Sequence, residues 1–348
     1  MSEPLRLVLA FVLAMAPAAL LCRVMMSVRI MDAPTEARKV QRHAVPTSGG
    51  VAVAISAFLA TVVVTELTPW DLDAVIFVTG AGALVALLLG LADDILTIRA
   101  TYRLVIVIAF TGAMAAFGAR VDVLGLWPGV TIELPYALAI IGSMAWLVVV
   151  INAVNFMDGA NGLAMGMAAI AAFALSLCAG FTGQWTLALL AMAVAGGLAG
   201  FLVWNIPGKL FAGDAGAYFA GAILGGLSLE FVKARPDLLF IPPMLLLPFL
   251  SDVLMTLAWR SMKGKKLFAA HRDHTYQIAM KAGLHHWQVS LVHAFWAVNG
   301  AVVAVAATIL GGQMPPVAFA ALALVSVLIH WRVRRSGVAA GLVGADIA

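Results

Sequence analysis

Residues 137–180 read ALAIIGSMAWLVVVINAVNFMDGANGLAMGMAAIAAFALSLCAG and set the fold class. Two apolar runs, 137–153 and 162–180, flank a short polar segment. A helix needs about 20 largely apolar residues to cross the hydrocarbon layer of a membrane, and both runs approach that length. Gly159 and Gly162 permit a sharp turn between the runs. The stretch therefore predicts two membrane-spanning helices joined by a polar turn at one face of the bilayer.

Composition extends this interpretation to the whole chain. Of the 348 residues, 63% are hydrophobic and 11% are charged, whereas soluble domains carry about 25% charged residues. Too few charges remain to cover a surface that faces water, so membrane lipids are the expected surroundings. The basic pI of 9.3 does not indicate a nucleic-acid partner in so apolar a chain; it suits contact with anionic lipid or phosphate.

Eleven apolar runs are candidate spans, and ten is the alternative count because two of the runs are short. They lie near 5–24, 49–66, 74–92, 103–119, 137–153, 162–180, 186–203, 214–231, 238–258, 288–310 and 315–331. We therefore expect an all-α, polytopic membrane helix bundle that forms a single domain over 1–348. The longest outer segment, about 120–136, predicts a short hairpin or an interfacial loop.

Charge indicates the orientation of these spans. With the N-terminus outside the cell and the C-terminus in the cytoplasm, 17 of the 21 Lys and Arg residues fall on the inner side, as the positive-inside rule expects. The expected location is a bacterial inner membrane. The unusual polar residues fall on the same side, in loops near 25–48, 93–103, 152–162, 204–214 and 259–287, which predicts an active-site cleft at the inner face.

The first two inner segments combine cations, glycines and carboxylates. Lys39 and Arg42 precede Pro46-Thr47-Ser48-Gly49-Gly50 at a helix entrance, where the backbone can approach an anion closely. An ordinary basic loop that sets topology is the alternative. Asp93 and Asp94 end an apolar run, where adjacent carboxylates are costly unless they face water, a cation or a partner. A solvated helix end is the alternative for this pair.

The third segment is the most informative. Asn152, Asn155 and Asp158 are three residues apart, so on a continuing helix they would share one side. Amide and carboxylate oxygens suit magnesium and the polar groups of a sugar or base. Capping of the helix end is the alternative, but it does not require so many polar groups beside a bilayer.

The last two segments also gather polar side chains. The fourth contains Asn205, Lys209 and Asp214, with Asp214 between glycines at the opening of a span; an Asp N-cap is the alternative. The fifth combines cations with His271, Arg272 and His274. Its cations suit a diphosphate or anionic headgroups, and no ligand spacing supports zinc.

Taken together, the five segments resemble the polyprenyl-phosphate N-acetylhexosamine-1-phosphate transferase family, glycosyltransferase family 4. The matching motifs occur in family order between about residues 30 and 285: Pro46-Thr47-Ser48-Gly49-Gly50, Asp93-Asp94, the Asn152/Asn155/Asp158 run, Asn205-Ile206-Pro207 with Gly213-Asp214-Ala215-Gly216, and His271-Arg272-Asp273-His274. The resemblance implies transfer of a sugar-1-phosphate from a UDP-N-acetylhexosamine to undecaprenyl phosphate, with release of UMP. It also implies magnesium as the metal, with manganese as the alternative.

The resemblance assigns roles to individual residues. It implies catalytic roles for Asp93, Asp94, Asp158 and His274, and metal ligation by Asp214, Asp158 and Asp94. It implies substrate contacts from Lys39, Arg42, Thr47, Gly49, Asn152, Asn155, Asn205, Lys209, His271 and Arg272.

Two departures from the family pattern indicate a branch. Tyr276 and Gln277 stand where a further His pair is frequent, and Asn161 replaces a frequent Asp. Both favour the enzymes that initiate O-antigen or related surface glycans over the phospho-MurNAc-pentapeptide transferase of peptidoglycan synthesis, which remains the alternative. From another class, a secondary transporter or lipid flippase would place its polar site near the bilayer midplane. A homodimer stays open beside a monomer.

Overall fold

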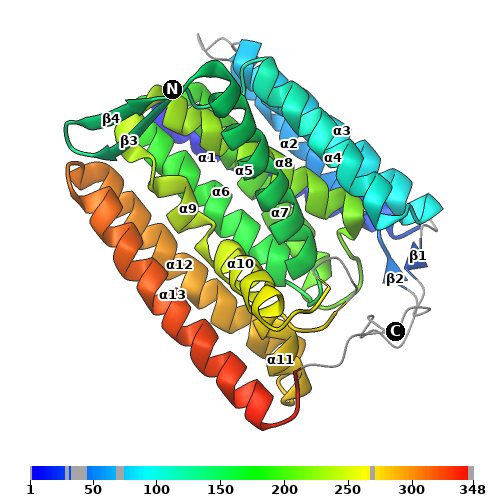
Figure 1. Ribbon diagram of the computed structural model, residues 1–348. Helices are drawn as coiled ribbons and strands as arrows, with labels where there is room; N and C mark the ends of the chain where they lie inside the picture. The colour runs from blue at the N-terminus through cyan, green and yellow to red at the C-terminus, as the bar shows by residue number, and fades with distance from the viewer. Residues whose placement is uncertain (1, 28–30, 33–44, 68–73, 267–270, 344–348) are drawn as a thin grey trace.

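The computed structural model describes residues 2–27, 31–32, 45–67, 74–266 and 271–343. These residues form a bundle of long helices with two short pairs of antiparallel strands (Figure 1). The long helices are α1 (Glu3–Met25), α2 (Gly49–Glu66), α3 (Ala74–Leu96), α4 (Ala100–Ala116), α5 (Tyr136–Met157), α6 (Leu163–Phe181), α7 (Trp185–Asn205), α8 (Gly213–Ala234), α10 (Leu247–Met262), α12 (His286–Leu310) and α13 (Met314–Ala339). The short elements are η1 (Pro236–Leu238), α9 (Ile241–Leu245), α11 (Thr275–Lys281), β1 (Met31–Asp32), β2 (Val45–Pro46), β3 (Val123–Trp127) and β4 (Val130–Glu133).

The predicted spans coincide with helical segments. Among the described residues, nine helices are long and apolar enough to cross a membrane, and a bent pair makes ten. The eleventh predicted span is α4, which is apolar but only 17 residues long. The polytopic, all-α membrane fold expected from the sequence is therefore confirmed.

Prolines account for the break between the two helices of the bent pair. The 238–258 run divides between η1–α9 and α10, with an angle of 76° at the break. Pro242 lies at the start of α9 and Pro248 at the start of α10. Proline lacks the N–H that a continuing helix needs and fits only the first turn, so each proline favours a new helix start.

The 120–136 segment forms the hairpin that was one of the two expected forms. β3 and β4 are antiparallel, with Val123 opposite Glu133 and Leu124 opposite Ile132. Gly129 has a φ of +77° in the turn, a backbone region that glycine enters without a steric penalty. The hairpin lies at the end of the bundle opposite α11 (Figure 1).

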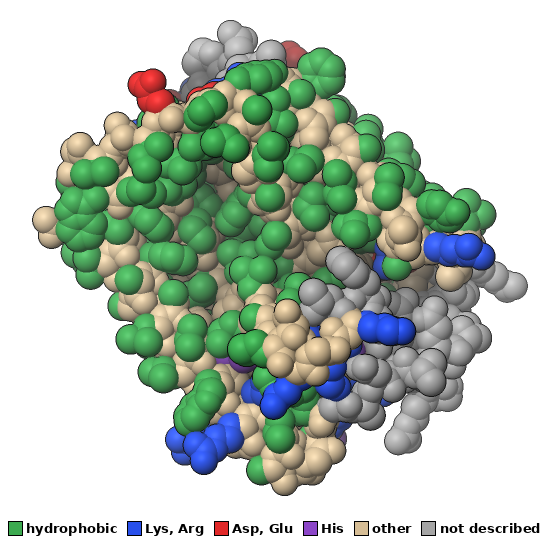
Figure 2. Space-filling model, viewed as in Figure 1, with side chains coloured by type: hydrophobic (Ala, Val, Ile, Leu, Met, Phe, Trp, Pro, Cys, Tyr) green, Lys and Arg blue, Asp and Glu red, His purple; other side chains and the backbone are tan. Residues whose placement is uncertain are grey.

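The outer surface of the bundle suits lipid rather than water. Large apolar side chains point outward from several helices, including Phe77, Leu96 and Phe295, each about 70% exposed. Figure 2 shows hydrophobic side chains over most of one side, with Lys and Arg gathered mainly toward the end that carries α11. A surface this apolar would be unstable in water. The protein is therefore a multi-pass membrane protein.

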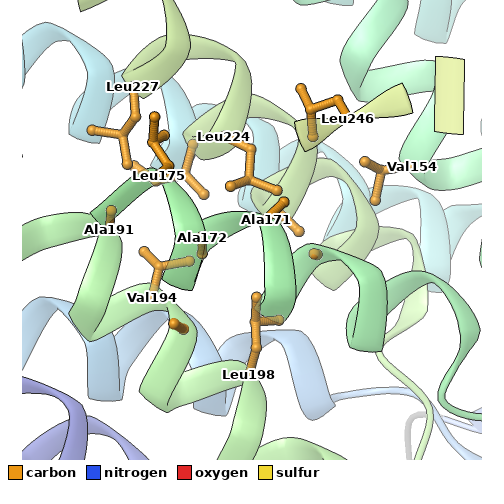
Figure 3. Packing of buried hydrophobic residues seen from close by; sticks show 14 of the residues in the cluster. Val154, Ala171, Ala172, Leu175, Ala191, Val194, Leu198, Leu224, Leu227 and Leu246 are labelled. Carbon is orange, nitrogen blue, oxygen red and sulfur yellow. The ribbon is translucent and has the colours of Figure 1, made fainter. Parts of the chain in front are cut away.

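Helix α8 forms the centre of the bundle. Its apolar window is entirely buried, and Leu224 and Leu227 pack with Leu175 of α6 (Figure 3). A Cβ on Gly90 of α3 would lie 2.3 Å from the Asp214 carbonyl oxygen. Close approach of backbones at small residues is typical of membrane helices. This contact brings the carboxylates at the end of α3 to the start of α8.

Candidate active site

Polar side chains from α3, α4, α5 and α8 meet at one end of the bundle. Asn155 Nδ2 donates to Asp214 Oδ1 at 2.7 Å. Arg103 Nη1 lies 3.3 Å from Asp214 Oδ2 and also forms an ion pair with Asp93. Segments that are distant in the sequence thus supply one connected network, and the structure brings together Asp93, Asn155 and Asp214 as the sequence motifs suggested.

Asp94 positions the helix that carries Asp214. Its Oδ1 accepts from the Asp214 amide at 2.9 Å, and its Oδ2 accepts from the Ala215 amide at 3.2 Å. The first amides of a helix have no partner within the helix, and a carboxylate satisfies them well. Both Asp94 oxygens face the start of α8. Asp94 therefore caps α8, and metal ligation by Asp94 stays a prediction.

Asp93 is buried and fully engaged. It is 7% exposed, its Oδ1 accepts from the Ile98 amide at 2.7 Å, and its Oδ2 pairs with Arg103. Thr97, between α3 and α4, has a φ of +52°, which is unfavourable for a β-branched residue. This turn delivers the Ile98 amide to Asp93. Both oxygens of Asp93 are therefore occupied, and Arg103 links Asp93 to Asp214.

Asp158 has fewer partners than Asp93, Asp94 and Asp214, the other carboxylates described at this site. It lies just beyond the end of α5 and is half-buried. Among the described residues, no hydrogen-bond donor contacts its side chain. Burial and the negative charge of Asp214 raise its pKa to about 7. Such a group gains from a nearby cation, which would favour its charged form.

The oxygen donors fit magnesium in part. Within the described ranges, no group of three or more His, Cys, Asp or Glu side chains is arranged as a complete metal site. Magnesium, however, is usually held by one or two carboxylates together with water and substrate phosphates. Asp158 and Asp214, two carboxylates that repel each other, suit that mode. Asn155 supplies a neutral oxygen beside them.

The glycine turn of the first inner segment has a packing role. The Gly49 amide donates to the Phe211 carbonyl and the Gly50 amide to the Ala212 carbonyl, each at 3.1 Å. Thr47 is buried. The Gly49 amide thus already has an acceptor, and the substrate contact of Gly49 stays a prediction. Lys39 and Arg42, predicted to contact substrate, lie outside the described residues.

Asn205 and Asn152 are bonded within the fold. The Gly162 amide donates to Asn205 Oδ1 at 2.7 Å, and Asn205 Nδ2 donates to the Leu210 carbonyl at 3.0 Å. Both ends of this buried amide are used in joining two turns, and the substrate contact of Asn205 stays a prediction. Asn152 Nδ2 donates to the Val148 carbonyl of its own helix.

Lys209, also expected to contact substrate, is exposed. Its Nζ lies 5.9 Å from the centre of the Trp204 ring. A cation over an indole is stabilised without being immobilised. Lys209 therefore stays a predicted substrate contact at the rim of this end.

His274 faces the site from the fifth segment. Its ring centre lies 6.0 Å from that of Phe156, which is two residues before Asp158. Its Nδ1 lies 3.2 Å from Asp252 Oδ1 in α10. The rings of His271 and His274 stack, with centres 5.1 Å apart. The structure thus places this pair beside the Asp158 turn, with the half-buried Arg272 between them in sequence.

Two members of this site were not predicted from the sequence. Arg103 is one of the 17 cations predicted to lie on the inner side, and it lies in the first turns of α4, ten residues after Asp93. Asp252 lies in the middle of the 238–258 apolar run and is not among the predicted site residues. A charged side chain within a span is costly and usually functional, so that signal was present in the sequence.

The fold and this site define a polytopic membrane protein with a carboxylate-rich centre at one end of a helix bundle. Residues 75–232 match the family model described as glycosyl transferase family 4. The chain is 26% identical over 297 residues to a probable undecaprenyl-phosphate N-acetylglucosaminyl 1-phosphate transferase of Bacillus subtilis, covering 83% of this chain and 81% of that protein.

Several other relatives are phospho-N-acetylmuramoyl-pentapeptide-transferases. The phospho-N-acetylmuramoyl-pentapeptide-transferase of Symbiobacterium thermophilum is 30% identical over 282 residues, covering 75% of this chain and 82% of that protein. The corresponding protein of Bacillus subtilis is 29% identical over 276 residues, covering 74% and 81%. This chain belongs to glycosyl transferase family 4, and it is a transferase.

Proposed function

We propose that this protein transfers an N-acetylhexosamine-1-phosphate from a UDP-sugar to undecaprenyl phosphate, as the initiating step of O-antigen or a related surface glycan. The contact of Arg103 with both Asp93 and Asp214 carries this proposal. A single cation shared by two carboxylates can exchange one partner for a phosphate. The names of the relatives supply the two substrate classes, a polyprenyl phosphate and a sugar phosphate donor.

The reaction requires one bond to form and one to break. An oxygen of the acceptor phosphate attacks the donor phosphorus that carries the sugar, and the bond from that phosphorus to UMP breaks. Asp93 orients the acceptor through Arg103, while Asp214 and Asp158 would hold magnesium at the donor diphosphate. Magnesium supplies charge neutralisation of the diphosphate and of the leaving UMP.

The proposed orientation places this site at the cytoplasmic face. Lys and Arg gather toward the end that carries α11 (Figure 2), and cytoplasmic loops of membrane proteins are rich in these residues. A nucleotide sugar is soluble, whereas undecaprenyl phosphate lies in the membrane. A site at the inner membrane face meets both substrates, with the N-terminus outside and the C-terminus inside.

Tyr276 supports a simple sugar as the donor. Its hydroxyl donates to the Phe156 carbonyl at 3.1 Å, and a Cβ on Gly159 would lie 2.2 Å from the Tyr276 oxygen. The bulky ring therefore fills the space beside the Asp158 turn. The specific alternative is the peptide-bearing UDP-MurNAc donor, which the names of several relatives favour.

A donor panel tests this function. Purified protein in detergent is supplied with undecaprenyl phosphate, magnesium and either UDP-N-acetylhexosamines or UDP-MurNAc-pentapeptide, and UMP release is followed. We expect release with an N-acetylhexosamine donor that depends on both lipid and magnesium. Release with the pentapeptide donor alone would replace this branch by the alternative. If folded protein releases no UMP with any of these donors, the proposal that it uses a UDP-sugar and undecaprenyl phosphate is contradicted.

Replacing Arg103 is expected to impair this reaction strongly. Arg103→Met leaves Asp93 buried without its countercharge and removes the proposed acceptor anchor, so UMP release should fall about 100-fold, as for loss of one preorganised electrostatic donor. Arg99→Met is the matched control, because Arg99 is exposed four residues earlier. Steady-state rates of both variants check the expectation. Equal rates would remove Arg103 from the mechanism.

A further inference from the structure

A second polar network lies beneath the segment that carries His274. It joins α10, α13 and residues 273–275, and its charged members are almost completely buried. Asp273 forms an ion pair with Arg260, with neither side chain exposed. Asp252 accepts from the Thr275 amide at 3.0 Å. Buried charges are costly unless they are paired and hydrogen-bonded, so this network needs a stronger reason than filling space.

Arg334, from the last helix α13, ties the network together. It is 5% exposed. Its Nη2 donates to the Asp273 carbonyl at 2.8 Å and to Thr256 Oγ1 at 2.7 Å. Its guanidinium lies 4.6 Å from the centre of the Trp259 ring. The Asp273 carbonyl belongs to the peptide that links Asp273 to His274, so Arg334 holds the backbone at that histidine.

The imidazole ring of His274 is positioned by hydrogen bonding as well. Asp252 lies at Nδ1, and Thr256 Oγ1 donates to the same Asp252 oxygen at 3.2 Å. A carboxylate at one ring nitrogen orients a histidine and leaves the other nitrogen for a ligand. Because Thr256 contacts both Asp252 and Arg334, the ring and the backbone of His274 depend on one connected set of bonds.

Helix α13 and the turn that follows it contact the same region. A Cβ on Gly337 in α13 would lie 2.7 Å from the Ile278 side chain of α11. Lys281 Nζ donates to the carbonyls of Arg272 and Leu342 at 2.9 and 3.0 Å. The last span and the turn after it therefore pack directly on the segment from residue 272 to 281.

We propose that Arg334 is a positioning residue, which fixes the His271–His274 segment from the last membrane span so that His274 meets the donor diphosphate. This proposal rests on the proposed function for the identity of the donor. It extends the active machinery to α13, which lies beyond the residues 75–232 that match the family model. Arg334 itself does not touch the substrate; it acts through the peptide before His274 and through Thr256.

Two measurements on the full-length protein test the proposal. In Arg334→Met, we expect the KM for the UDP-sugar to rise about tenfold and kcat to fall about tenfold, since small displacements of a positioned group cost up to about 100-fold in kcat/KM. The KM for undecaprenyl phosphate should stay within about twofold, because the proposed acceptor contacts at Asp93 and Arg103 are separate. A misfolded fraction would lower the apparent kcat without raising one KM selectively.

Hydrogen exchange supplies a readout that needs no substrate. The amides of residues 273–278 should exchange about tenfold faster in Arg334→Met, while those of α6 and α7 stay unchanged, because loss of the clamp opens the segment locally. Arg332→Met is the matched control, since Arg332 is exposed two residues earlier. It should behave as the wild type in both measurements.

The outcomes separate this proposal from the proposed function. Unchanged exchange and unchanged KM values in Arg334→Met would overturn it, as would faster exchange throughout α6 and α7, which would make Arg334 a general structural residue. If Arg334→Met does not fold, Thr256→Val removes the shared hydroxyl at nearly constant volume and should show the same selective changes, smaller in size. If the wild type uses no donor, the function fails, and exchange alone still decides whether Arg334 holds the segment.

Discussion

Asp214→Asn should lower UMP release about 1,000-fold, because it removes the charge at the centre of the site. Loss of this proposed metal ligand would cost several kcal/mol of transition-state stabilisation, and each ~1.4 kcal/mol is tenfold in rate. Asp214 also accepts hydrogen bonds from Asn155 Nδ2 at 2.7 Å and from Arg103 Nη1 at 3.3 Å. An amide in its place presents an N–H group to one of these donors, so the network would rearrange as well.

The control for this substitution is an aspartate at the other end of the bundle. Asp237 is exposed and pairs with Arg235 at 2.7 Å, and Asp237→Asn should keep the wild-type rate within about twofold, since surface pairs contribute little. Initial rates are measured over a magnesium series, with monodispersity checked for each variant. An Asp214→Asn rate above a tenth of the wild-type rate would rule out a central role for this carboxylate.

Gly213→Ala should destabilise the protein by roughly 3 kcal/mol and also reduce turnover. The φ of Gly213 is +70°, and this left-handed region costs about 1–2 kcal/mol for a residue with a Cβ. That Cβ would lie 2.4 Å from both the Thr47 carbonyl oxygen and Asp94 Oδ2, and such overpacking adds about 1–3 kcal/mol. Relief of the clash displaces Asp94 from the start of α8 and so misplaces Asp214.

Gly129→Ala separates the two contributions. Gly129 has a similar φ of +77°, but among the described residues no heavy atom lies within 4 Å of the position that a Cβ would occupy there. The substitution should cost only the backbone penalty, about 1 kcal/mol, and leave turnover unchanged. Thermal unfolding in detergent and UMP release are measured for both variants. If both variants lose the same stability, the contact of the added Cβ with Asp94 and Thr47 does not contribute to the destabilisation of Gly213→Ala.

The membrane spans and the grouping of the motif residues could be predicted from the sequence alone. The apolar runs, such as 137–153 and 162–180, are long because a bilayer requires helices of a given length. Each predicted run therefore coincides with a helical segment, although α4 is shorter than a full span and the 238–258 run is bent. The motif residues Asp93, Asn155 and Asp214 could be grouped because each follows or precedes an apolar run on the same side. These are local properties of the chain, and periodicity and length are sufficient to reveal them.

Which partner each polar side chain has depends on contacts between segments that are distant in the sequence. Asp93 and Asp94 are neighbours with identical chemistry, yet Asp93 pairs with Arg103 and Asp94 caps α8. Asn205 joins two turns, whereas Asn155 reaches Asp214. Sequence alone predicted that these groups occur at one membrane face. The partners of Asp94, for example, follow from the close approach of α3 to α8 at Gly90, because only the packed bundle determines which donor each buried oxygen meets.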